Sequence, residues 1–268
     1  MNDAIGIRAV ADAAGVSPGT VSNVVTGKRP VSAATRARVE AAVERLGYTP
    51  HPGAQSLRSN RTGVVALIVP TLTNPFYPLV AAGMHDVLLP RDIMLSVTEV
   101  DGPGRSARVL RHLISRRSDG IVAAPFGLTP ADVELLRQSA VPFVTLGAPL
   151  DGSGGDRVHT DDVDGAREVT EHLIARGYRR IAFVGGPESA VPTRERLDGY
   201  LAALTSHGIE KRAEHVSFGD FTREYGRVAA GHLLDSATPP RAIVAGNDLI
   251  AIGVIDAARE RGVSIPDQ

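Results

Sequence analysis

The chain has 268 residues, of which 43% are hydrophobic, and its formal net charge at pH 7 is −1. This length exceeds that of a typical single domain, and the apolar fraction can fill more than one buried core. The chain has no cysteine, which excludes a disulfide framework and thiolate metal sites. No apolar run approaches the length of a membrane span and no secretion signal is visible, so we expect a cytoplasmic protein without a membrane partner.

Residues 7–26 predict two short helices joined by a tight turn. Apolar residues recur at helical spacing over Ile7–Ala14, and Gly15 permits the turn that a helix-turn-helix requires. Ser17 is a suitable N-cap for the second helix, and Pro18 fits its first position because that position needs no amide donor. We expect the second helix to bury three valines, namely Val21, Val24 and Val25.

The solvent-facing side of the second helix is a candidate DNA-reading surface. In a helix-turn-helix the N-terminal end of this helix enters the major groove, where small polar residues approach base edges and phosphates. The residues at this end are Ser17, Pro18, Gly19, Thr20, Ser22 and Asn23. A third helix between Ser32 and Gly47 completes a three-helix head. The alternative is a three-helix bundle that binds no ligand.

Charge is unevenly distributed along the chain. Residues 1–61 carry eight lysines and arginines against four acidic residues, a net charge of +4, which leaves −5 for residues 62–268. A basic first module ahead of an acidic remainder concentrates the attraction for DNA phosphates in the first module. The charge pattern therefore supports DNA binding by residues 1–61.

Residues 62–268 alternate between apolar strands and helices. The predicted strands are Val64–Val69, Ile93–Val97, Gly120–Ala124, Phe143–Leu146, Arg180–Val184, His215–Phe218 and Ala242–Ala245. The predicted helices are 76–89, 105–117, 130–139, 163–176, 194–207, 222–235 and 248–261. Such alternation predicts parallel sheets covered on both faces, with ligands at the carboxyl ends of the strands. Two successive sets of strands and helices predict a bilobed α/β core that holds a ligand between its lobes.

Several motifs resemble those of the LacI/GalR family of bacterial transcription regulators. They are ADAAGVSPGTVSNVVTGKRPVS and TRARVEAAVERLGYTPHPGAQSLRSNRTG in the first module, and VALIVPTLTNPFYPLVAAG, HTDDVDGAREVTEHLIARGYRRIAFVGGP, RERLDGY and RAIVAGNDLIAIGV beyond it. The resemblance implies an all-α helix-turn-helix head followed by a bilobed α/β core similar to that of periplasmic binding proteins. It also implies a homodimeric repressor in the bacterial cytoplasm, associated with the nucleoid. Such a repressor binds palindromic operator DNA and responds to a small-molecule effector, a sugar or sugar derivative, without a cofactor.

The resemblance divides the chain into four parts. They are a helix-turn-helix domain (1–47), a hinge (48–61), an N-terminal lobe (62–160) and a C-terminal lobe (161–268). We refer to residues 1–61 as the head and to residues 62–268 as the core. Because the family continues with a further strand after the point that matches Gln268, we expect the second lobe of this chain to be incomplete.

The segment between the helix-turn-helix and the core is the predicted hinge. Tyr48–Pro52 is a poor helix former because of its two prolines, and 53–58 can form only a short helix that is marginal in isolation. In the resembling family this helix folds on operator DNA and inserts a leucine into the minor groove. Leu57 matches that leucine, with Ala54 one turn before it and Arg58 beside it, and an apolar wedge of this kind kinks the duplex. The alternative is that Leu57 packs on the core as part of a linker.

The resemblance also implies effector contacts at the ends of the predicted strands. Asn74, Phe76 and Tyr77 follow the first strand and match a family segment whose aromatic residues border the ligand cleft. Arg196, in RERLDGY, matches the arginine that binds the effector, and its planar guanidinium suits a pair of hydroxyl groups or a carboxylate. The remaining candidates are Asn247 and Asp248, which match positions on the opposite wall, together with Phe221 and Asp161.

No catalytic or metal-binding pattern competes with the binding hypothesis. The eight histidines are scattered, with no pair at metal-ligand spacing. Ser153 lies in a turn that lacks the strand–turn–helix context of a hydrolase nucleophile. We therefore expect a regulator and not an enzyme, with no metal. The alternative is a small-molecule-binding module or an inactive truncated fragment that does not regulate through DNA.

Overall fold

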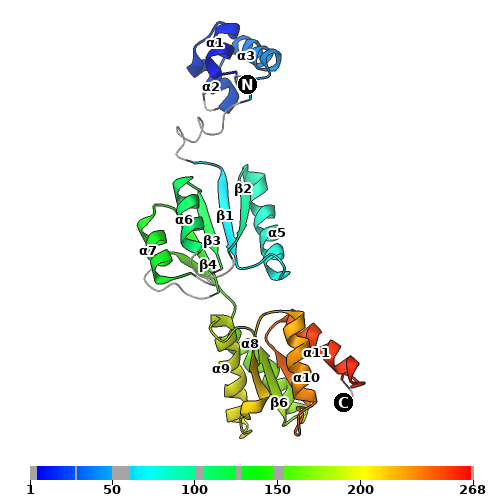
Figure 1. Ribbon diagram of the computed structural model, residues 1–268. Coiled ribbons are helices and arrows are strands. Elements are labelled where there is room, and N and C mark those ends of the chain that lie inside the picture. The colour runs from blue at the N-terminus through cyan, green and yellow to red at the C-terminus, as the bar shows by residue number, and fades with distance from the viewer. Residues whose placement is uncertain are drawn as a thin grey trace. The chain divides into compact units, whose positions relative to one another are not determined.

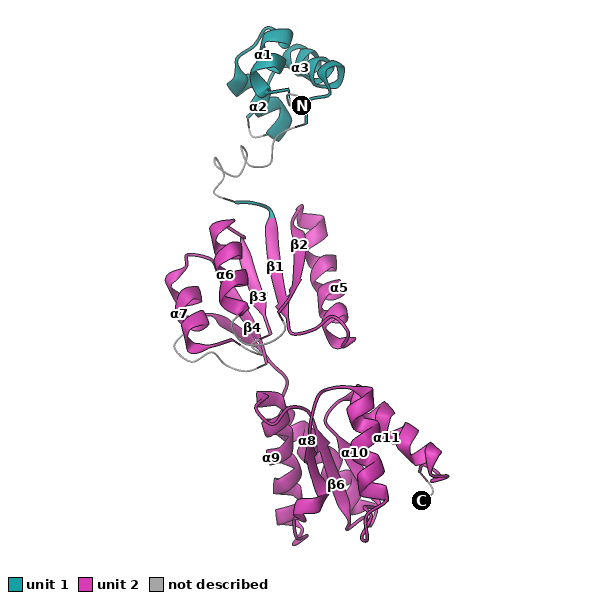
Figure 2. Cartoon of the chain, in the orientation of Figure 1, with its two compact units in different colours: residues 1–63 teal, residues 64–268 magenta. Residues whose placement is uncertain are grey.

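The computed structural model of the protein describes residues 5–27, 29–49, 61–100, 105–124, 128–147 and 154–266. The chain divides into two compact units, Met1–Gly63 and Val64–Gln268, which Figure 2 colours separately. The first unit holds the described helices of the head, and the second holds two α/β lobes. No described helix is both long enough and apolar enough to cross a membrane.

The head contains the described helices α1 (Ile7–Ala14), α2 (Pro18–Thr26) and α3 (Ala33–Leu46), labelled in Figure 1. Gly15 has a left-handed φ of 63° between α1 and α2, a conformation that glycine adopts without steric cost. The Ser17 hydroxyl accepts a hydrogen bond from the Thr20 amide at 3.1 Å, and Pro18 lies in the first turn of α2. These features confirm the predicted helix-turn-helix.

The three head helices share one apolar core. It consists of Val10, Ala11, Ala14, Val21, Val24, Val39 and Ala42. The prediction that Val25 is buried is wrong, because its side chain is 37% exposed. In so small a bundle the buried stripe of α2 is narrow, and it is centred on Val21 and Val24, so the next residue along the helix turns toward solvent.

The first lobe is built on a five-stranded parallel sheet (Figure 1). Its strands are β1 (Val64–Val69), β2 (Met94–Glu99), β3 (Gly120–Ala123), β4 (Phe143–Leu146) and β5 (Asp156–Val158), in the spatial order β2-β1-β3-β4-β5. The helices between them are α5 (Phe76–Leu88), α6 (Ser106–Ser115) and α7 (Pro130–Gln138), with a short 3-10 helix at Leu89–Arg91. Val65 of β1 is aligned with Leu95 of β2 and with Gly120 of β3.

Alternate residues of β1 pack on opposite faces of this sheet. Ala66 and Ile68 pack with residues of α6 and α7, whereas Leu67 and Val69 pack with Tyr77 at the start of α5. Because successive side chains of a strand point to opposite faces, a continuous apolar run such as β1 is buried on both. The predicted parallel sheet with two covered faces is confirmed for this lobe.

The second lobe repeats this arrangement around three described strands in the order β7-β6-β8. Its elements are α8 (Asp162–Ala175), β6 (Ile181–Gly185), α9 (Val191–Ser206), a 3-10 helix (Ala213–His215), β7 (Val216–Phe218), α10 (Arg223–Leu234), β8 (Ala242–Ala245) and α11 (Asp248–Glu260). Ile181 and Phe183 of β6 pack toward α8 and α9, and Ala182 and Val184 pack toward α10 and α11. The central strand is therefore covered on both faces.

Helices α8 and α9 approach each other closely at Gly199. A Cβ atom at this position would lie 2.1 Å from the Val163 carbonyl oxygen and 2.9 Å from the Arg167 amide nitrogen. No larger residue fits there unless the helices separate. The close crossing brings the part of α9 just before Gly199 next to the first turn of α8.

In each sheet the strand order reverses at one point, between β1 and β3 in the first and between β6 and β8 in the second. Loops that leave the carboxyl ends of two such strands diverge, and the crevice between them is where ligands bind in open parallel sheets. Residues 70–75 follow β1, residues 186–190 follow β6, and residues 246–247 follow β8. These loops carry or adjoin most of the predicted effector residues.

Large apolar side chains are exposed on one side of the first lobe. They lie on α5, on the 3-10 helix after it and on β2, which packs beside α5 at an edge of the described sheet (Figure 1). The most exposed are Leu79 at 71% and Met94 at 65%. The surface that we call the α5–β2 face consists of Leu79, Val87, Leu89 and Val97, whereas Met94 points to the opposite face of β2. A monomer rarely exposes a large contiguous apolar patch, so this face is a candidate interface.

Candidate functional site

The N-terminal end of α2 presents small groups and no acidic side chain. The predicted DNA contacts at this end are all exposed or half-buried, namely Ser17, Pro18, Gly19, Thr20, Ser22 and Asn23. None of the helices α1, α2 and α3 has an aspartate or glutamate in its first turn. Because helix N-termini carry partial positive charge and point amide groups outward, this end of α2 can accept a phosphate oxygen.

Basic side chains lie on the same unit as this surface. Arg36 of α3 forms an exposed ion pair with Glu40, with 3.7 Å between Nη1 and Oε1. An exposed pair of this kind contributes little to stability, so the arginine can exchange its partner for a DNA phosphate. The predicted minor-groove residues Ala54, Leu57 and Arg58 lie outside the described residues, and their role stays a prediction.

Arg196, early in α9, joins three segments of the second lobe. Its Nε and Nη2 both donate to Oδ1 of Asp162 at 3.0 Å, and its Nη1 donates to the carbonyl oxygen of Gly246 after β8. The side chains of Arg196 and Asp162 are 29% and 13% exposed, so the pair is partly shielded from water. The guanidinium is therefore held at the crevice between β6 and β8.

The other polar candidates of this lobe serve as helix caps. Oδ1 of Asn247 accepts a hydrogen bond from the Ile250 amide at 2.9 Å and caps α11. Oδ1 of Asp161 accepts one from the Asp164 amide at 3.0 Å and caps α8. Asp248 is exposed in the first turn of α11. Asn247 directly follows the Gly246 carbonyl that Arg196 binds, so both lie on the same lobe.

In the first lobe, Tyr77 is the candidate that interacts electrostatically with Arg196. Its side chain is 6% exposed and packs with Leu67, Val69 and Ala124. Burial raises the pKa of the Tyr77 phenol to about 12, and the positive charge of Arg196 opposes this shift. The hydroxyl is consequently neutral at physiological pH and can donate or accept a hydrogen bond.

Phe76 and Asn74 shape the loop that positions Tyr77. Oδ1 of Asn74 accepts a hydrogen bond from the Phe76 amide at 3.1 Å, and its carbonyl oxygen accepts one from the Tyr77 amide at 3.2 Å. The Phe76 ring meets the Tyr77 ring edge to face with a centroid distance of 5.1 Å. Phe76 itself is 56% exposed. Asn74 therefore acts on the backbone, and Phe76 offers an accessible apolar ring.

Phe221 lies against the loop that follows β6. A Cβ atom at Gly186 would lie 2.3 Å from the Phe221 ring, so the ring occupies the space over this glycine. Phe221 is half-buried and packs against the apolar cluster between β6, α10 and α11. Its position beside the β6 loop places an aromatic surface near the same crevice as Arg196.

Sequence reasoning did not identify two partners of this site. Asp162 binds Arg196, whereas the neighbouring Asp161 was the predicted effector contact. Glu195 lies 3.9 Å from Arg157 of β5 in an ion pair between the two lobes. Both partners lie beside a predicted residue. No local pattern indicates Asp162, because its bond to Arg196 joins residues 34 positions apart in the chain.

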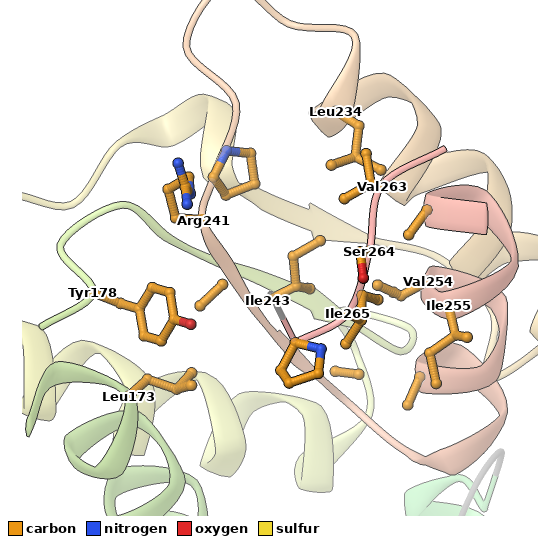
Figure 3. Close-up of a pocket in the computed structure, with 16 residues that line it drawn as sticks. Leu173, Tyr178, Leu234, Arg241, Ile243, Val254, Ile255, Val263, Ser264 and Ile265 are labelled. Atoms are coloured by element: carbon orange, nitrogen blue, oxygen red, sulfur yellow. The ribbon is translucent and has the colours of Figure 1, made fainter. Parts of the chain in front are cut away.

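A separate apolar pocket of about 290 Å³ lies along β8 and α11 (Figure 3). Its lining includes Ile243, Val254, Ile265, Leu173 and Tyr178, and none of the predicted effector residues borders it. A sugar site needs several polar groups that fix the orientation of hydroxyls, and this pocket is lined mainly by apolar side chains. Among the described residues there is also no group of three or more histidine, aspartate or glutamate side chains that could hold a metal ion.

The chain matches two protein families over nearly its whole length. Residues 6–51 match the bacterial regulatory proteins of the lacI family, and residues 62–268 match the periplasmic binding proteins and sugar-binding domain of the LacI family. The ribose operon repressor of Escherichia coli K12 is 34% identical over 263 residues, covering 97% of this chain and 79% of that protein.

Solved structures agree with these matches. A complex of the transcriptional regulator CelR with cellobiose has 33% identity and a TM-score of 0.67, over 98% of this chain and 80% of that one. The lac repressor dimer bound to operator and the anti-inducer ONPF has 27% identity and a TM-score of 0.85, over 97% of this chain and 79% of that one. The predicted combination of a helix-turn-helix head with a parallel α/β core is thereby confirmed.

Proposed function

We propose, because the chain belongs to the LacI family of bacterial regulatory proteins, that it is a homodimeric repressor whose operator affinity is set by a sugar bound between Tyr77 and Arg196. The observation that carries this proposal is the position of Arg196 at the β6–β8 crevice with Tyr77 within its electrostatic reach. The two residues come from different lobes. A ligand held by both would favour one arrangement of the lobes, which is how binding can couple to a distant DNA site.

The chemistry of the site supports a polyhydroxy ligand. Three of the five N–H groups of Arg196 bond to Asp162 and Gly246 among the described residues, so two are left for a pair of ligand oxygens. The Tyr77 hydroxyl adds a neutral donor and acceptor, and the exposed Phe76 ring adds an apolar face for a sugar ring. The ligands named for two relatives, in a ribose operon repressor and a CelR–cellobiose complex, support the same ligand class.

Operator binding measured with a panel of neutral sugars tests this function. Palindromic DNA selected in vitro should bind the protein, and one sugar of a panel that includes ribose and cellobiose should change the affinity by roughly 5- to 150-fold. Arg196→Ala should abolish this response and leave the sugar-free affinity nearly unchanged. Arg194→Ala is the matched control, because Arg194 is an exposed arginine of the same helix. An undiminished response in Arg196→Ala would refute the assignment of the site.

The α5–β2 face supports dimerisation through the first lobe. A palindromic operator needs two heads at a fixed spacing. We therefore propose that a second copy of the chain packs on this face, because a two-fold symmetric dimer presents two heads. Leu79→Asp should shift the protein from dimer to monomer in sedimentation and weaken operator binding. Val169→Asp, at a residue of α8 that is 53% exposed, is the control and should leave the mass unchanged. A dimeric Leu79→Asp variant would exclude this face.

The proposed role is that of a binding protein in the bacterial cytoplasm. Its described site contains caps, an ion pair and a neutral phenol, which orient a ligand without transferring a group to it. No enzymatic step is therefore included in the proposal. The alternative of a sugar-binding module that does not regulate through DNA would be supported if sugar bound tightly and operator affinity did not change.

A further inference from the structure

The partner of Arg196 determines what charge this site can accept. Arg196 is the one cation of the described effector candidates, and a free arginine at the edge of a sheet would favour a carboxylate or phosphate. Here Oδ1 of Asp162 accepts from both Nε and Nη2 of Arg196 at 3.0 Å. The formal charge of the guanidinium is therefore balanced inside the site itself.

The position of Asp162 is set by the adjacent helix crossing and by one side-chain hydrogen bond. The close crossing of α8 and α9 at Gly199 lies one residue after Asp162 on α8, where Val163 would meet any added Cβ. The Thr160 hydroxyl donates to the same Oδ1 at 3.3 Å. Since Asp162 is only 13% exposed, water screens its charge weakly.

Other charges at this end of the lobe act in the same direction. Asp161 and Asp248 lie at the N-termini of α8 and α11, whereas the charge of Glu195, beside Arg196 on α9, is balanced by Arg157. The N-termini of these helices alone would attract an anion. The carboxylates of Asp161 and Asp248 oppose that attraction, while hydroxyl groups can still bond to the remaining N–H groups of Arg196.

We propose that Asp162 is the residue that makes this site select uncharged polyhydroxy ligands and reject anionic ones such as sugar phosphates and sugar acids. This inference rests on the proposed effector site. Asp162 acts through Arg196, as a positioning and charge-balancing residue. A carboxylate in a binding site repels anionic ligands, and such repulsion is a common source of specificity. It lowers the affinity for a neutral ligand very little.

Inorganic phosphate is the probe for the test, because it carries the anionic charge without a sugar. Calorimetry and thermal shift with the full chain should detect little or no phosphate binding by the wild type. Asp162→Asn keeps the size and an oxygen acceptor but removes the charge, and should bind phosphate roughly tenfold or more tightly, the scale at which a like charge opposes a ligand. The double variant Asp162→Asn, Arg196→Ala should lose this gain.

Asp164→Asn is the matched control. Asp164 lies in the same first turn of α8, but its carboxylate is exposed and binds Arg167 with 2.9 Å to Nη2. Its neutralisation changes the charge of the helix end equally and should give no gain in phosphate binding. If Asp162→Asn does not fold, as circular dichroism would reveal, Asp162→Ser replaces it, because serine is also tolerated at a helix start.

Three results would overturn the proposal, and two of them concern Asp162 itself. One is phosphate binding by the wild type as tight as by Asp162→Asn, and the other is a folded Asp162 variant with no gain. An equal gain in Asp164→Asn would also overturn it, because the effect would then belong to the helix end and not to the pair. The assay uses neither DNA nor sugar, so its failure is distinct from the absence of a sugar response, which would refute the proposed function.

Discussion

The helix N-termini of the head differ in charge from three of the four described helix N-termini of the second lobe. In the head, α1, α2 and α3 begin without any acidic residue in the first turn, and α2 starts with a serine cap and a proline. In the second lobe, α8 begins with Asp162 and Asp164, α10 with Glu224 and α11 with Asp248, whereas α9 has no acidic residue in its first turn. In our proposals, the start of α2 faces DNA phosphates, whereas the starts of α8 and α11 are kept from anionic ligands.

This difference shows that a helix cap alone does not indicate a ligand site. Ser17 and Asn247 both accept a hydrogen bond from the amide three residues later, and both satisfy the start of a helix. What distinguishes the two regions is the charge placed beside the cap. Acidic residues stabilise a helix start by roughly 0.3–1 kcal/mol, so their absence from the head gives up some stability and favours phosphate binding.

The largest effect, on operator affinity, should follow when an acidic residue is placed at a helix start of the head, as at α8 and α11 of the second lobe. Gly19→Asp places a carboxylate in the first turn of α2, where the added Cβ would meet only the Ser17 hydroxyl at 3.6 Å. Operator affinity should fall on the order of 100-fold, because the charge repels DNA phosphates. The melting temperature should stay equal or rise, because an acid suits a helix start and replaces a glycine.

Gly19→Asn is the control for Gly19→Asp, since it adds the same volume without charge. Fluorescence anisotropy at two salt concentrations should give a difference between the two variants that shrinks as salt rises. If Gly19→Asp binds operator as well as Gly19→Asn, the N-terminal end of α2 does not face the DNA. The absence of acidic residues from the helix starts of the head would then have another cause.

Much of the fold could be predicted from the sequence because its signals are local. The apolar run of β1 and the caps at Ser17 and Ser32 specify their elements from adjacent residues, and their bounds agree with the structure. The pattern does not indicate β5, because Asp156–Val158 has only three residues and all are exposed. That strand depends on pairing with β4, which no local pattern reports.

The site could be predicted less completely because its contacts are not local. Arg196 is implied by the motif around it, but its bonds reach residues 34 and 50 positions away in the chain. The choice of Asp162 and not Asp161 as partner depends on how α8 crosses α9, and single-sequence patterns do not fix such crossings. Tyr77 likewise depends on which side of the first sheet α5 covers.

A smaller effect should follow from a change at the helix crossing that holds Asp162. Gly199→Ala would place a methyl group 2.1 Å from the Val163 carbonyl oxygen, so α8 and α9 must move apart. The free energy of unfolding should fall by about 1–3 kcal/mol in urea titrations. Gly165→Ala is the control, because a Cβ there meets nothing within 4 Å, and it should be neutral or stabilising.

The Gly199 variant also sharpens the comparison between the regions. If the crossing holds Asp162 against Arg196, its loosening should raise phosphate binding by the folded protein, in the direction expected for Asp162→Asn. Equal stability of Gly199→Ala and Gly165→Ala would contradict the close crossing. If the Gly199→Ala variant is destabilised but still rejects phosphate, the helix crossing does not contribute to the rejection of anions.

The smallest effect separates the two roles of Asn247, helix cap and proposed ligand contact. Asn247→Ala removes the acceptor for the Ile250 amide and should lower the free energy of unfolding by about 1 kcal/mol. Asn247→Ser keeps an acceptor and should retain most of the stability. The sugar response of operator binding should weaken in both variants, up to about tenfold, because serine cannot replace the amide that we propose as a ligand contact. If Asn247→Ser keeps the full sugar response, Asn247 acts as a helix cap alone. Ser17→Asn is the matching exchange of caps in the head, and it should preserve the stability of the head.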